Sequence, residues 1–339
     1  MRPRWARRSR TARPRRDEGA SRAWPDRLRV FLTGATGVIG RRALALLIGA
    51  GHDVTAAGRT PEKRRSLEKA GARAVDVDLY DVTALRQAMR AHSVVLNLAT
   101  HMPASATRMM LPWSWRENDH VRRDGSKAVV DAAIAEGVHR VVQESFAPIY
   151  ADGGDAWITE DWPVQPVRYN RSILDAERSA ARFTASGGVG IVLRFAALYG
   201  PDHLLREMLD VIRKGWSPLP GSPDAYITSV AQDDAAAAVV AALELPAGIY
   251  NVAETDPLPR GRWVNSLADA AGLAHPRPIP RVLTRLGGSL LALLSRSERI
   301  SSSKLRDATG WRPWYANAAV AWPDVLEKLR VQDGMGAAL

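Results

Sequence analysis

A glycine-rich segment constrains the fold of this 339-residue chain more than any other feature. The segment, Thr33–Gly40, has the sequence TGATGVIG, with glycine at its second, fifth and eighth positions. A short run of β-forming residues, Leu28–Leu32, comes immediately before it, and the apolar helical run Arg41–Ile48 follows. A strand, a glycine turn of this spacing and a helix, in that order, form the context in which a dinucleotide pyrophosphate binds.

The spacing of the glycines has a physical reason at each position. Gly34 allows the sharp turn, and Gly37 lets the backbone come close to a pyrophosphate. Gly40 lets the helix pack closely on the strand, so that the N–H groups and dipole of the helix N-terminus face the anion. A glycine turn without a ligand is the alternative. The predicted cofactor contacts in the turn are Gly34, Ala35, Thr36, Gly37, Val38 and Ile39.

Beyond this turn, strand-like apolar runs alternate with helical patterns as far as about Gly200. Such alternation is typical of βαβ units and a parallel sheet, and right-handed crossovers then wind the chain over both faces. We expect an α/β fold with a Rossmann-like, doubly wound parallel sheet over residues 28–200. After that point prolines interrupt the pattern, which predicts a smaller C-terminal α/β substrate lobe over residues 201–339, interleaved with the sheet.

The net charge of +11 is unevenly distributed. Residues 1–29 contain eleven arginines and three acidic residues, so they carry +8 and the rest of the chain is nearly neutral. Residues 1–27 lack apolar periodicity and are rich in Arg, Pro and Ser, which predicts a disordered basic tail. A solvated tail, or translated sequence ahead of the true start, is the plainest interpretation. Contact with nucleic acid or a membrane, and a targeting role, are the alternatives.

Composition excludes several classes of site. The chain has no cysteine, which excludes disulfides, thiolate metal sites and a cysteine nucleophile. No apolar run approaches the roughly 18 residues that span a bilayer, and the seven histidines show no metal-ligand spacing. We therefore expect a cytoplasmic protein that acts on a small molecule, with no metal, membrane or nucleic acid as partner. The sequence leaves a homodimer open.

The residue after the second predicted strand distinguishes NADP from NAD. An acid at this point binds the ribose 2′-OH of NAD, whereas an arginine accommodates the 2′-phosphate of NADP. Here Asp53–Ala57 is followed by Arg59, 19 residues after Gly40, and by a basic cluster at 63–65. This pattern favours NADP as the cofactor, with NAD as the alternative. A solvated, basic start of a helix would give the same pattern.

Several motifs spread along the chain resemble the extended short-chain dehydrogenase/reductase family, also called the NAD-dependent epimerase/dehydratase family. The turn at Thr33–Gly40 matches the family's Thr-Gly-x-x-Gly-x-x-Gly motif, and the likeness extends from about Leu28 to about Leu329. The other matching motifs are Asp78-Leu79, Asn97-Leu98-Ala99, Arg194 with Tyr199-Gly200-Pro201, Tyr250-Asn251-Val252, and Lys304-Leu305 with Gly310-Trp311-Arg312-Pro313.

The resemblance implies further cofactor contacts. The family's Asp and the apolar residue after it, here Asp78 and Leu79, meet the adenine. The small residues at the end of its fourth strand, here Leu98 and Ala99, lie near the nicotinamide ribose.

The catalytic positions depart from the family pattern. The family's Tyr-x-x-x-Lys motif aligns with Tyr169, but Ile173 stands where the lysine is expected. The position of the family's Ser or Thr aligns with Phe146, next to Ser145, and the position of its Asn aligns with Arg122. The resemblance thus implies Tyr169 and Ser145 as catalytic residues, in an incomplete set.

The missing lysine favours one direction of reaction. In the family the lysine lowers the pKa of the tyrosine, and an isoleucine cannot do so. A tyrosine with a pKa near 10 is ionised in only about one molecule in a thousand at pH 7, so it is a poor base but is ready to act as an acid. We therefore predict an NADPH-dependent carbonyl reductase. The alternatives are a non-catalytic NADP(H)-binding redox sensor or scaffold and a nucleotide-sugar epimerase or dehydratase.

A loop rich in Met and Trp, His101–Trp115, follows a predicted strand at the edge of the sheet where ligands bind. Its composition suggests an apolar wall for the substrate. A hydrophobic lid or a contact between subunits would explain the loop equally well.

Overall fold

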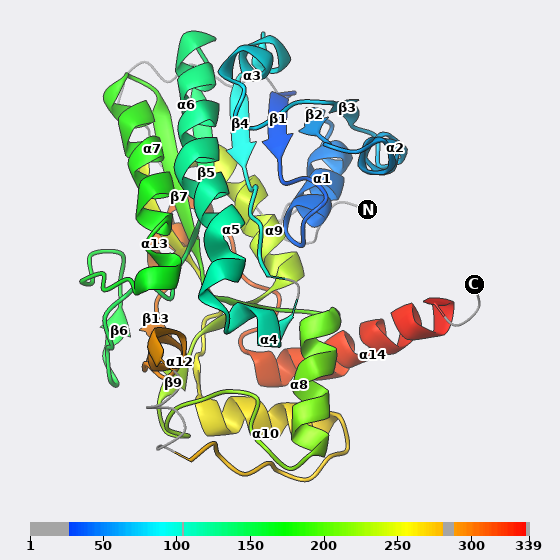
Figure 1. Ribbon diagram of the computed structural model, residues 1–339, viewed down its shortest axis with the longest axis vertical. Helices are drawn as coiled ribbons and strands as arrows, with labels where there is room; N and C mark the ends of the chain where they lie inside the picture. Colours follow the sequence, from blue (N-terminus) through cyan, green and yellow to red (C-terminus); the bar gives the residue numbers. More distant parts are fainter. Residues whose placement is uncertain (1–26, 104, 281–287, 337–339) are drawn as a thin grey trace.

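The computed structural model describes residues 27–280, apart from residue 104, and residues 288–336 (Figure 1). The predicted basic tail lies outside the described residues except for Arg27. The centre of the fold is a seven-stranded sheet in which every neighbouring pair of strands is parallel. In spatial order its strands are β11 (Gly248–Val252), β7 (Val189–Phe195), β5 (Arg140–Phe146), β4 (Val94–Asn97), β1 (Arg29–Thr33), β2 (Asp53–Ala57) and β3 (Arg73–Val75).

The order of the strands defines where a ligand can bind. From β1 the chain moves outward to β2 and β3, and it then returns to β4 on the other side of β1. Ligands of doubly wound sheets bind at the carboxyl ends of the strands at this reversal. The Rossmann-like fold predicted from the sequence is confirmed, and the reversal falls between β1 and β4.

Helices cover both faces of the sheet because its strands are apolar on both faces. In β1, Val30 and Leu32 belong to one core while Phe31 belongs to another, as the alternation of side chains in a strand requires. The core with Phe31 packs against helices in the foreground of Figure 1, and the core with Val30 packs against helices behind the sheet. The foreground helices are α3 (Val82–Met89), α6 (Ser126–Ala135) and α7 (Ile173–Ala185); those behind are α1 (Gly40–Gly49) and α9 (Gln232–Ala241).

The second half of the chain contributes to two regions. Strand β11 joins the large sheet beside β7, and helix α9 packs against α1, while the division into two lobes stays a prediction. A separate apolar cluster, in which Trp322 packs on Tyr199 and Trp263, forms the core of the smaller lobe. The helices around this cluster are α8 (His203–Arg213), α10 (Arg260–Ala270) and α14 (Ala318–Gly336).

Short elements complete the smaller lobe and its junction with the sheet. The paired short strands are β8 (Ala197–Tyr199) with β10 (Ser229–Ala231), β9 (Tyr226–Ile227) with β12 (Leu258–Pro259), and β6 (Trp157–Ile158) with β13 (Arg299–Ile300). Further helical segments are α2 (Pro61–Lys69), α12 (Gly288–Leu294), α13 (Ser303–Thr309) and the short turns η4 (Arg168–Asn170) and η5 (Ala242–Glu244).

Between β4 and α6 the chain forms a series of short helical segments. They are α4 (Ala106–Met109), η2 (Pro112–Trp115), α5 (Arg116–His120) and η3 (Val121–Gly125). The last of these is a single π turn, so α5, η3 and α6 form one helix with a bulge. π bulges occur often at functional sites, and this one lies beside the carboxyl ends of the strands.

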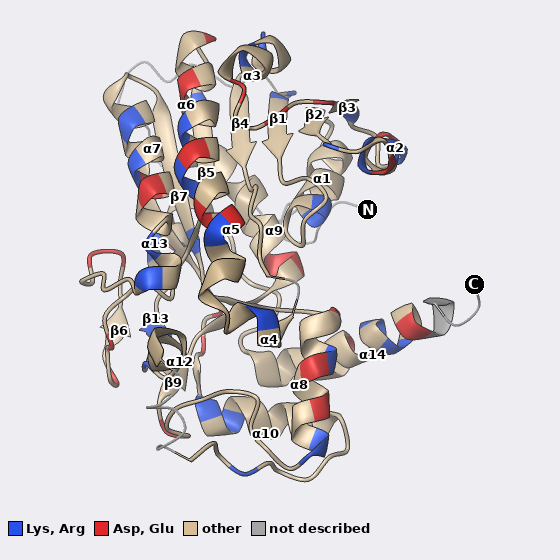
Figure 2. Cartoon of the chain, in the orientation of Figure 1, with Lys and Arg blue, Asp and Glu red and all other residues tan. Residues whose placement is uncertain are grey.

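The described part of the chain carries charges of both signs on the same helices, as α6 and α7 show (Figure 2). Within these residues, no helix combines the length and the apolar composition that crossing a bilayer requires.

Candidate active site

The glycine turn connects β1 to α1 at the carboxyl edge of the sheet. Gly34 has a φ of +67°, and a Cβ on it would lie 2.3 Å from the carbonyl oxygen of Leu98. A Cβ on Gly40 would lie 2.1 Å from the carbonyl oxygen of Gly34. Neither position can accept a side chain, so the turn lies directly against the end of β4 and α1 starts close to the sheet. The tip of the turn at 36–38 stays exposed.

A buried polar network joins the ends of three neighbouring strands. The Thr33 hydroxyl donates to Asn97 Oδ1 at 2.6 Å, and Asn97 Nδ2 donates to Gln143 Oε1 at 2.8 Å. Asn97 Nδ2 also donates to the Ser126 hydroxyl at the start of α6. These bonds hold the carboxyl ends of β1, β4 and β5 in a common frame, and they place Leu98, which follows β4, beside the glycine turn.

At the predicted adenosine end of the cofactor site, Arg59 lies close to the residues that follow β3. Arg59 is exposed and forms no hydrogen bond or ion pair with any residue that the structure describes. The side chain of Arg64, five residues further along the chain, already has partners: it donates to the Gly58 carbonyl at 3.0 Å and pairs with Asp76 at 2.7 Å. The Arg59 guanidinium is thus available to a ligand.

The pKa of Tyr80 depends on the charges around that site. Burial, with the Glu117 carboxylate next to it, raises the pKa of Tyr80 to about 12, while the Arg59 charge acts in the opposite direction. Asp78 accepts the Tyr80 backbone N–H at 3.0 Å, so its carboxylate shapes this turn. Arg59, Asp78 and Leu79 therefore lie in the same part of the structure, and their role as cofactor contacts stays a prediction.

Tyr169 lies in the turn η4, just before α7, among apolar neighbours. Its ring packs on Trp115 with 4.8 Å between the ring centroids, and Ile173, one turn further on, is fully buried. Burial raises the pKa of Tyr169 well above its ordinary value, and the Glu298 carboxylate adds to this effect. Arg122 and Arg296 oppose it. The hydroxyl therefore keeps its proton at neutral pH.

The loop His101–Trp115 covers Tyr169 from one side. Trp115 is buried, and its indole N–H donates to the carbonyl of Met109 at 2.8 Å. Met102, Met110 and Trp113 are exposed, the last by 62%. The loop is thus anchored next to the tyrosine and presents apolar side chains to the solvent.

Ser145 lies near the end of β5, and its hydroxyl is engaged by another side chain. Its hydroxyl donates to Glu177 Oε1 at 2.6 Å, and Arg194 binds both oxygens of Glu177, at 2.8 and 2.7 Å. Arg194 also donates to the Tyr150 hydroxyl, which in turn donates to Asn251 at 2.7 Å. The Ser145 proton is therefore engaged in a buried network, and a catalytic role for Ser145 stays a prediction.

Sequence reasoning missed one ion pair at this edge of the sheet. Arg122, in the π turn, donates from Nη2 to Glu144 Oε1 at 2.9 Å, and both side chains are buried. Arg122 Nε and Glu144 Oε2 have no partner among the described residues. A glutamate two residues after the predicted strand 138–142 was the available signal for this pair, because an acidic side chain at the buried end of a strand needs a partner.

A family model described as NAD(P)H-binding matches residues 34–246 of this chain. The chain is also 30% identical over 317 residues to a 3-diazoavenalumate denitrifying reductase from a Streptomyces species. That alignment covers 88% of this chain and 99% of the relative. The chain belongs to the extended short-chain dehydrogenase/reductase family. It is an NAD(P)-dependent oxidoreductase of that type, as its motifs predict.

Other members of the extended short-chain dehydrogenase/reductase family extend the comparison. A 2-alkyl-3-oxoalkanoate reductase from Shewanella oneidensis is 27% identical over 286 residues, which are 77% of this chain and 71% of the relative. Two solved structures share the fold. MoeE5 with UDP-glucose and NAD has a TM-score of 0.72 and 21% identity, covering 89% of this chain and 99% of that one. The human epimerase family protein SDR39U1 with NADPH has a TM-score of 0.72 and 19% identity, covering 89% and 100%.

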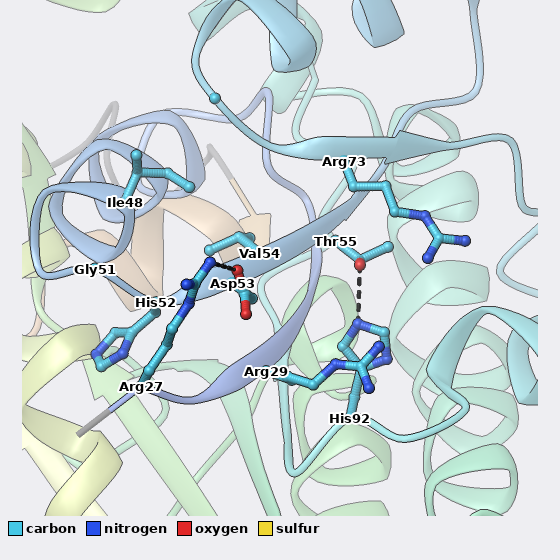
Figure 3. A pocket seen from close by; sticks show the side chains of 11 residues that line it. Arg27, Arg29, Ile48, Gly51, His52, Asp53, Val54, Thr55, Arg73 and His92 are labelled. Carbon is cyan, nitrogen blue, oxygen red and sulfur yellow. Dashed lines mark hydrogen bonds and ion pairs between the residues drawn. The ribbon is translucent and has the colours of Figure 1, made fainter. Parts of the chain in front are cut away.

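A hollow of about 840 Å³ lies at the opposite edge of the sheet from the family's cofactor position (Figure 3). Figure 3 shows Arg29, Asp53 and Arg73, at the starts of β1, β2 and β3, around it, together with His92, which bonds the Thr55 hydroxyl at 2.8 Å. Doubly wound sheets bind their ligands at the carboxyl ends of the strands, so this hollow is not the dinucleotide site. Among the described residues, no three His, Asp or Glu side chains gather closely enough to hold a metal ion.

The close approach at Gly40 leads to a testable expectation for this family member. Adding a methyl group in Gly40→Ala should displace the turn and weaken NADPH binding, with an overpacking cost of about 1–3 kcal/mol, or about 5- to 150-fold in affinity. Isothermal titration with NADPH measures this loss. Gly49→Ala is the matched control, because a Cβ there meets no atom within 4 Å. Equal affinity in the Gly40→Ala and Gly49→Ala variants would contradict the assigned site.

Proposed function

We propose that this chain is an NADPH-dependent reductase of ketones or aldehydes. The observation that carries the proposal is Tyr169, a half-buried tyrosine whose raised pKa keeps its hydroxyl protonated, one turn before Ile173, where the family has a lysine. The residues that would hold the dinucleotide are those of the glycine turn with Arg59, Asp78, Leu79, Leu98 and Ala99. When bound, NADPH supplies the hydride.

Tyr169 supports reduction better than oxidation. A carbonyl that gains hydride becomes an alkoxide, which is a much stronger base than a phenolate, so transfer of the Tyr169 proton to it is favourable. The reverse reaction needs Tyr169 to lose its proton first, and burial opposes the charged form. Because position 173 carries no cation, Tyr169 can act as an acid but is a poor base. This difference also weighs against the epimerase or dehydratase alternative, which begins with an oxidation.

The surroundings of Tyr169 support an apolar substrate. Trp115 packs on its ring, and the anchored loop carries exposed Met102, Met110 and Trp113. The name of the Shewanella relative is that of a reductase of 2-alkyl-3-oxoalkanoates, which combine a ketone with an alkyl chain. We therefore propose ketones with an apolar substituent as the first class to test. Preference for NADP, a cytoplasmic location and a homodimer stay predictions.

Turnover distinguishes the enzyme from the redox sensor. We expect NADPH to be oxidised in the presence of a ketone such as ethyl 2-methyl-3-oxobutanoate, with the alcohol as product identified by mass spectrometry. A panel of ketones and aldehydes of increasing chain length then maps the class. Tight NADPH binding without turnover of any member of the panel would favour the sensor.

Arg59 is the residue we expect to select the cofactor. A charge-assisted bond to the 2′-phosphate contributes about 1.5–3 kcal/mol, so NADPH should bind about 10- to 150-fold more tightly than NADH. Arg59→Asp should reverse this order, since the carboxylate repels the phosphate and accepts from a free 2′-OH. Fluorescence titration with both cofactors measures the ratio. Lys69→Ala, in the last turn of α2 and outside the basic cluster at 63–65, is the control expected to change little, and equal binding of both cofactors by the wild type would contradict the assignment.

A second candidate function follows from the same incomplete set of catalytic groups. With Phe146 and Ile173 at the family's hydroxyl and lysine positions, Tyr169 is the one member of the family's catalytic set that this chain keeps at its usual position. The Streptomyces relative is named a denitrifying reductase of a diazo compound. When hydride replaces N₂ on an aryl diazonium ion, one C–H bond forms, one C–N bond breaks, and the atoms and charges balance without a proton. Loss of Tyr169 should therefore leave that reaction intact, which separates the two candidates.

A further inference from the structure

The hollow at the amino ends of β1, β2 and β3 takes no part in the proposed reaction (Figure 3). Its volume of about 840 Å³ falls within the range of roughly 300–1,000 Å³ that is usual for small-molecule sites. Arg29 begins β1 and Thr33 ends it, so the five residues of this strand separate the hollow from the glycine turn. A molecule in the hollow and a dinucleotide on the turn can therefore be bound at the same time.

The register of the strands places the side chains of Arg29 and Arg73 on one face of the sheet. Arg29 lies opposite Asp53 on β2, and Arg73 lies opposite Thr55 on the same strand. Asp53 and Thr55 are two residues apart and share a face, so their partners on β1 and β3 share that face with them. His92 lies on it as well, because its ring bonds the Thr55 hydroxyl at 2.8 Å. In Figure 3 both arginine side chains lie next to this bond.

The guanidinium groups of Arg29 and Arg73 are available to a ligand. Both residues are exposed, and neither side chain forms a hydrogen bond or an ion pair with any residue in the described part of the chain. The third arginine of the lining, Arg27, is paired with Asp53, the acidic residue beside it. Three arginines and one aspartate give the lining a net charge of +2 when its histidines are neutral. The hollow is therefore suited to an anion.

Two histidines add polar nitrogen atoms to the lining. His92 is only 7% exposed, and its Nδ1 has no hydrogen-bond partner among the residues that the structure describes. His52 Nδ1 accepts the Leu28 backbone N–H at 3.3 Å, so in the neutral ring the proton lies on Nε2, which can donate to a ligand. Burial lowers the pKa of both histidines, so both are neutral at pH 7. A buried nitrogen without a partner, such as His92 Nδ1, is costly unless something binds it.

We propose that this hollow is a second ligand site, which binds a small molecule through a phosphate monoester group. Such a group carries a charge of about −1.5 to −2 at pH 7, which matches the lining, and its three oxygens accept hydrogen bonds. The planar guanidinium groups of Arg29 and Arg73 suit it because each can donate two parallel bonds to one phosphate. The rest of the hollow, bordered by Ile48 and His52, accepts the organic part of the ligand.

Isothermal titration of the whole protein with glucose 6-phosphate tests this site, with NADPH in excess so that the dinucleotide site is filled. We expect one equivalent to bind, and glucose, which lacks the phosphate, not to bind. Arg29→Met and Arg73→Met should each weaken binding by about 10- to 150-fold, as expected for the loss of a charge-assisted bond. Arg73→Lys should restore part of the affinity. Arg213→Met, which removes an exposed arginine from α8, is the control expected to bind as the wild type does.

Three results would overturn the proposal. The first is equal affinity in the wild type and in the double variant Arg29→Met/Arg73→Met, whose melting temperature should match that of the wild type because both side chains are exposed. The second is binding that is lost in Arg59→Met instead, since the phosphate would then occupy the cofactor site. The third is glucose 6-phosphate that inorganic phosphate fails to displace, because both present the same group to the arginines.

Discussion

Tyr169→Phe should reduce ketone reduction by about 10²- to 10⁴-fold in kcat/KM, the range for the loss of a positioned general acid. The change removes only the hydroxyl, because the phenylalanine ring can keep the packing on Trp115, whose centroid lies 4.8 Å from that of Tyr169. NADPH affinity should therefore stay at the wild-type value. Initial rates of ethyl 2-methyl-3-oxobutanoate reduction at pH 7, with a parallel NADPH titration, measure both quantities.

The control for this variant is Tyr315→Phe, which removes a hydroxyl from the other lobe, where it bonds Asp324 at 3.0 Å. It should keep the wild-type rate. Full ketone reduction by Tyr169→Phe would mean that the proton comes from another group, with Ser145 and Tyr150 the next candidates. Reduction of an aryl diazonium ion that survives in this variant, alongside a wild type inactive on every ketone, would establish the second candidate function.

The glycine turn and the sheet were predictable because their signals are local. The spacing of the glycines within Thr33–Gly40 indicates positions where the backbone packs too closely for a side chain. The atoms that these glycines contact, in Gly34 itself and at the end of β4, follow from the βαβ connection. The alternation of strands and helices encodes the parallel sheet in the same manner. Arg59 was singled out by its distance in sequence from Gly40, and Asp78 by the resemblance to the family.

The groups around Tyr169 were not predictable for the opposite reason. Glu298 is 129 residues from Tyr169 in sequence, so no local pattern could indicate that its charge helps to raise the pKa of Tyr169. The pairing of Arg122 with Glu144 depends on a π turn that no simple periodicity indicates. Ser145 illustrates the period of a strand: successive side chains point to opposite faces, so a hydroxyl one residue from the family position lies on the other face from Phe146, where it bonds Glu177.

We expect the largest loss of stability from a substitution that breaks the buried Glu177–Arg194 ion pair. Only 9% of the Glu177 side chain and 4% of the Arg194 side chain are exposed, and two hydrogen bonds join them. Arg194→Met should lower the free energy of unfolding by about 3–5 kcal/mol, because it leaves the Glu177 carboxylate buried without a cation. Unfolding in urea, followed by tryptophan fluorescence, measures the change.

Two further variants separate the loss of the cation from the loss of packing. In the double variant Arg194→Met/Glu177→Leu no charge is left buried, and replacing a buried pair by apolar residues is often neutral, so most of the stability should return. Arg178→Met removes a cation from an exposed pair with Asp175 on the same helix, and it should cost no more than about 1 kcal/mol. A double variant as unstable as Arg194→Met would show that the shape of the arginine, with its bond to Tyr150, stabilises this region more than the neutralisation of Glu177.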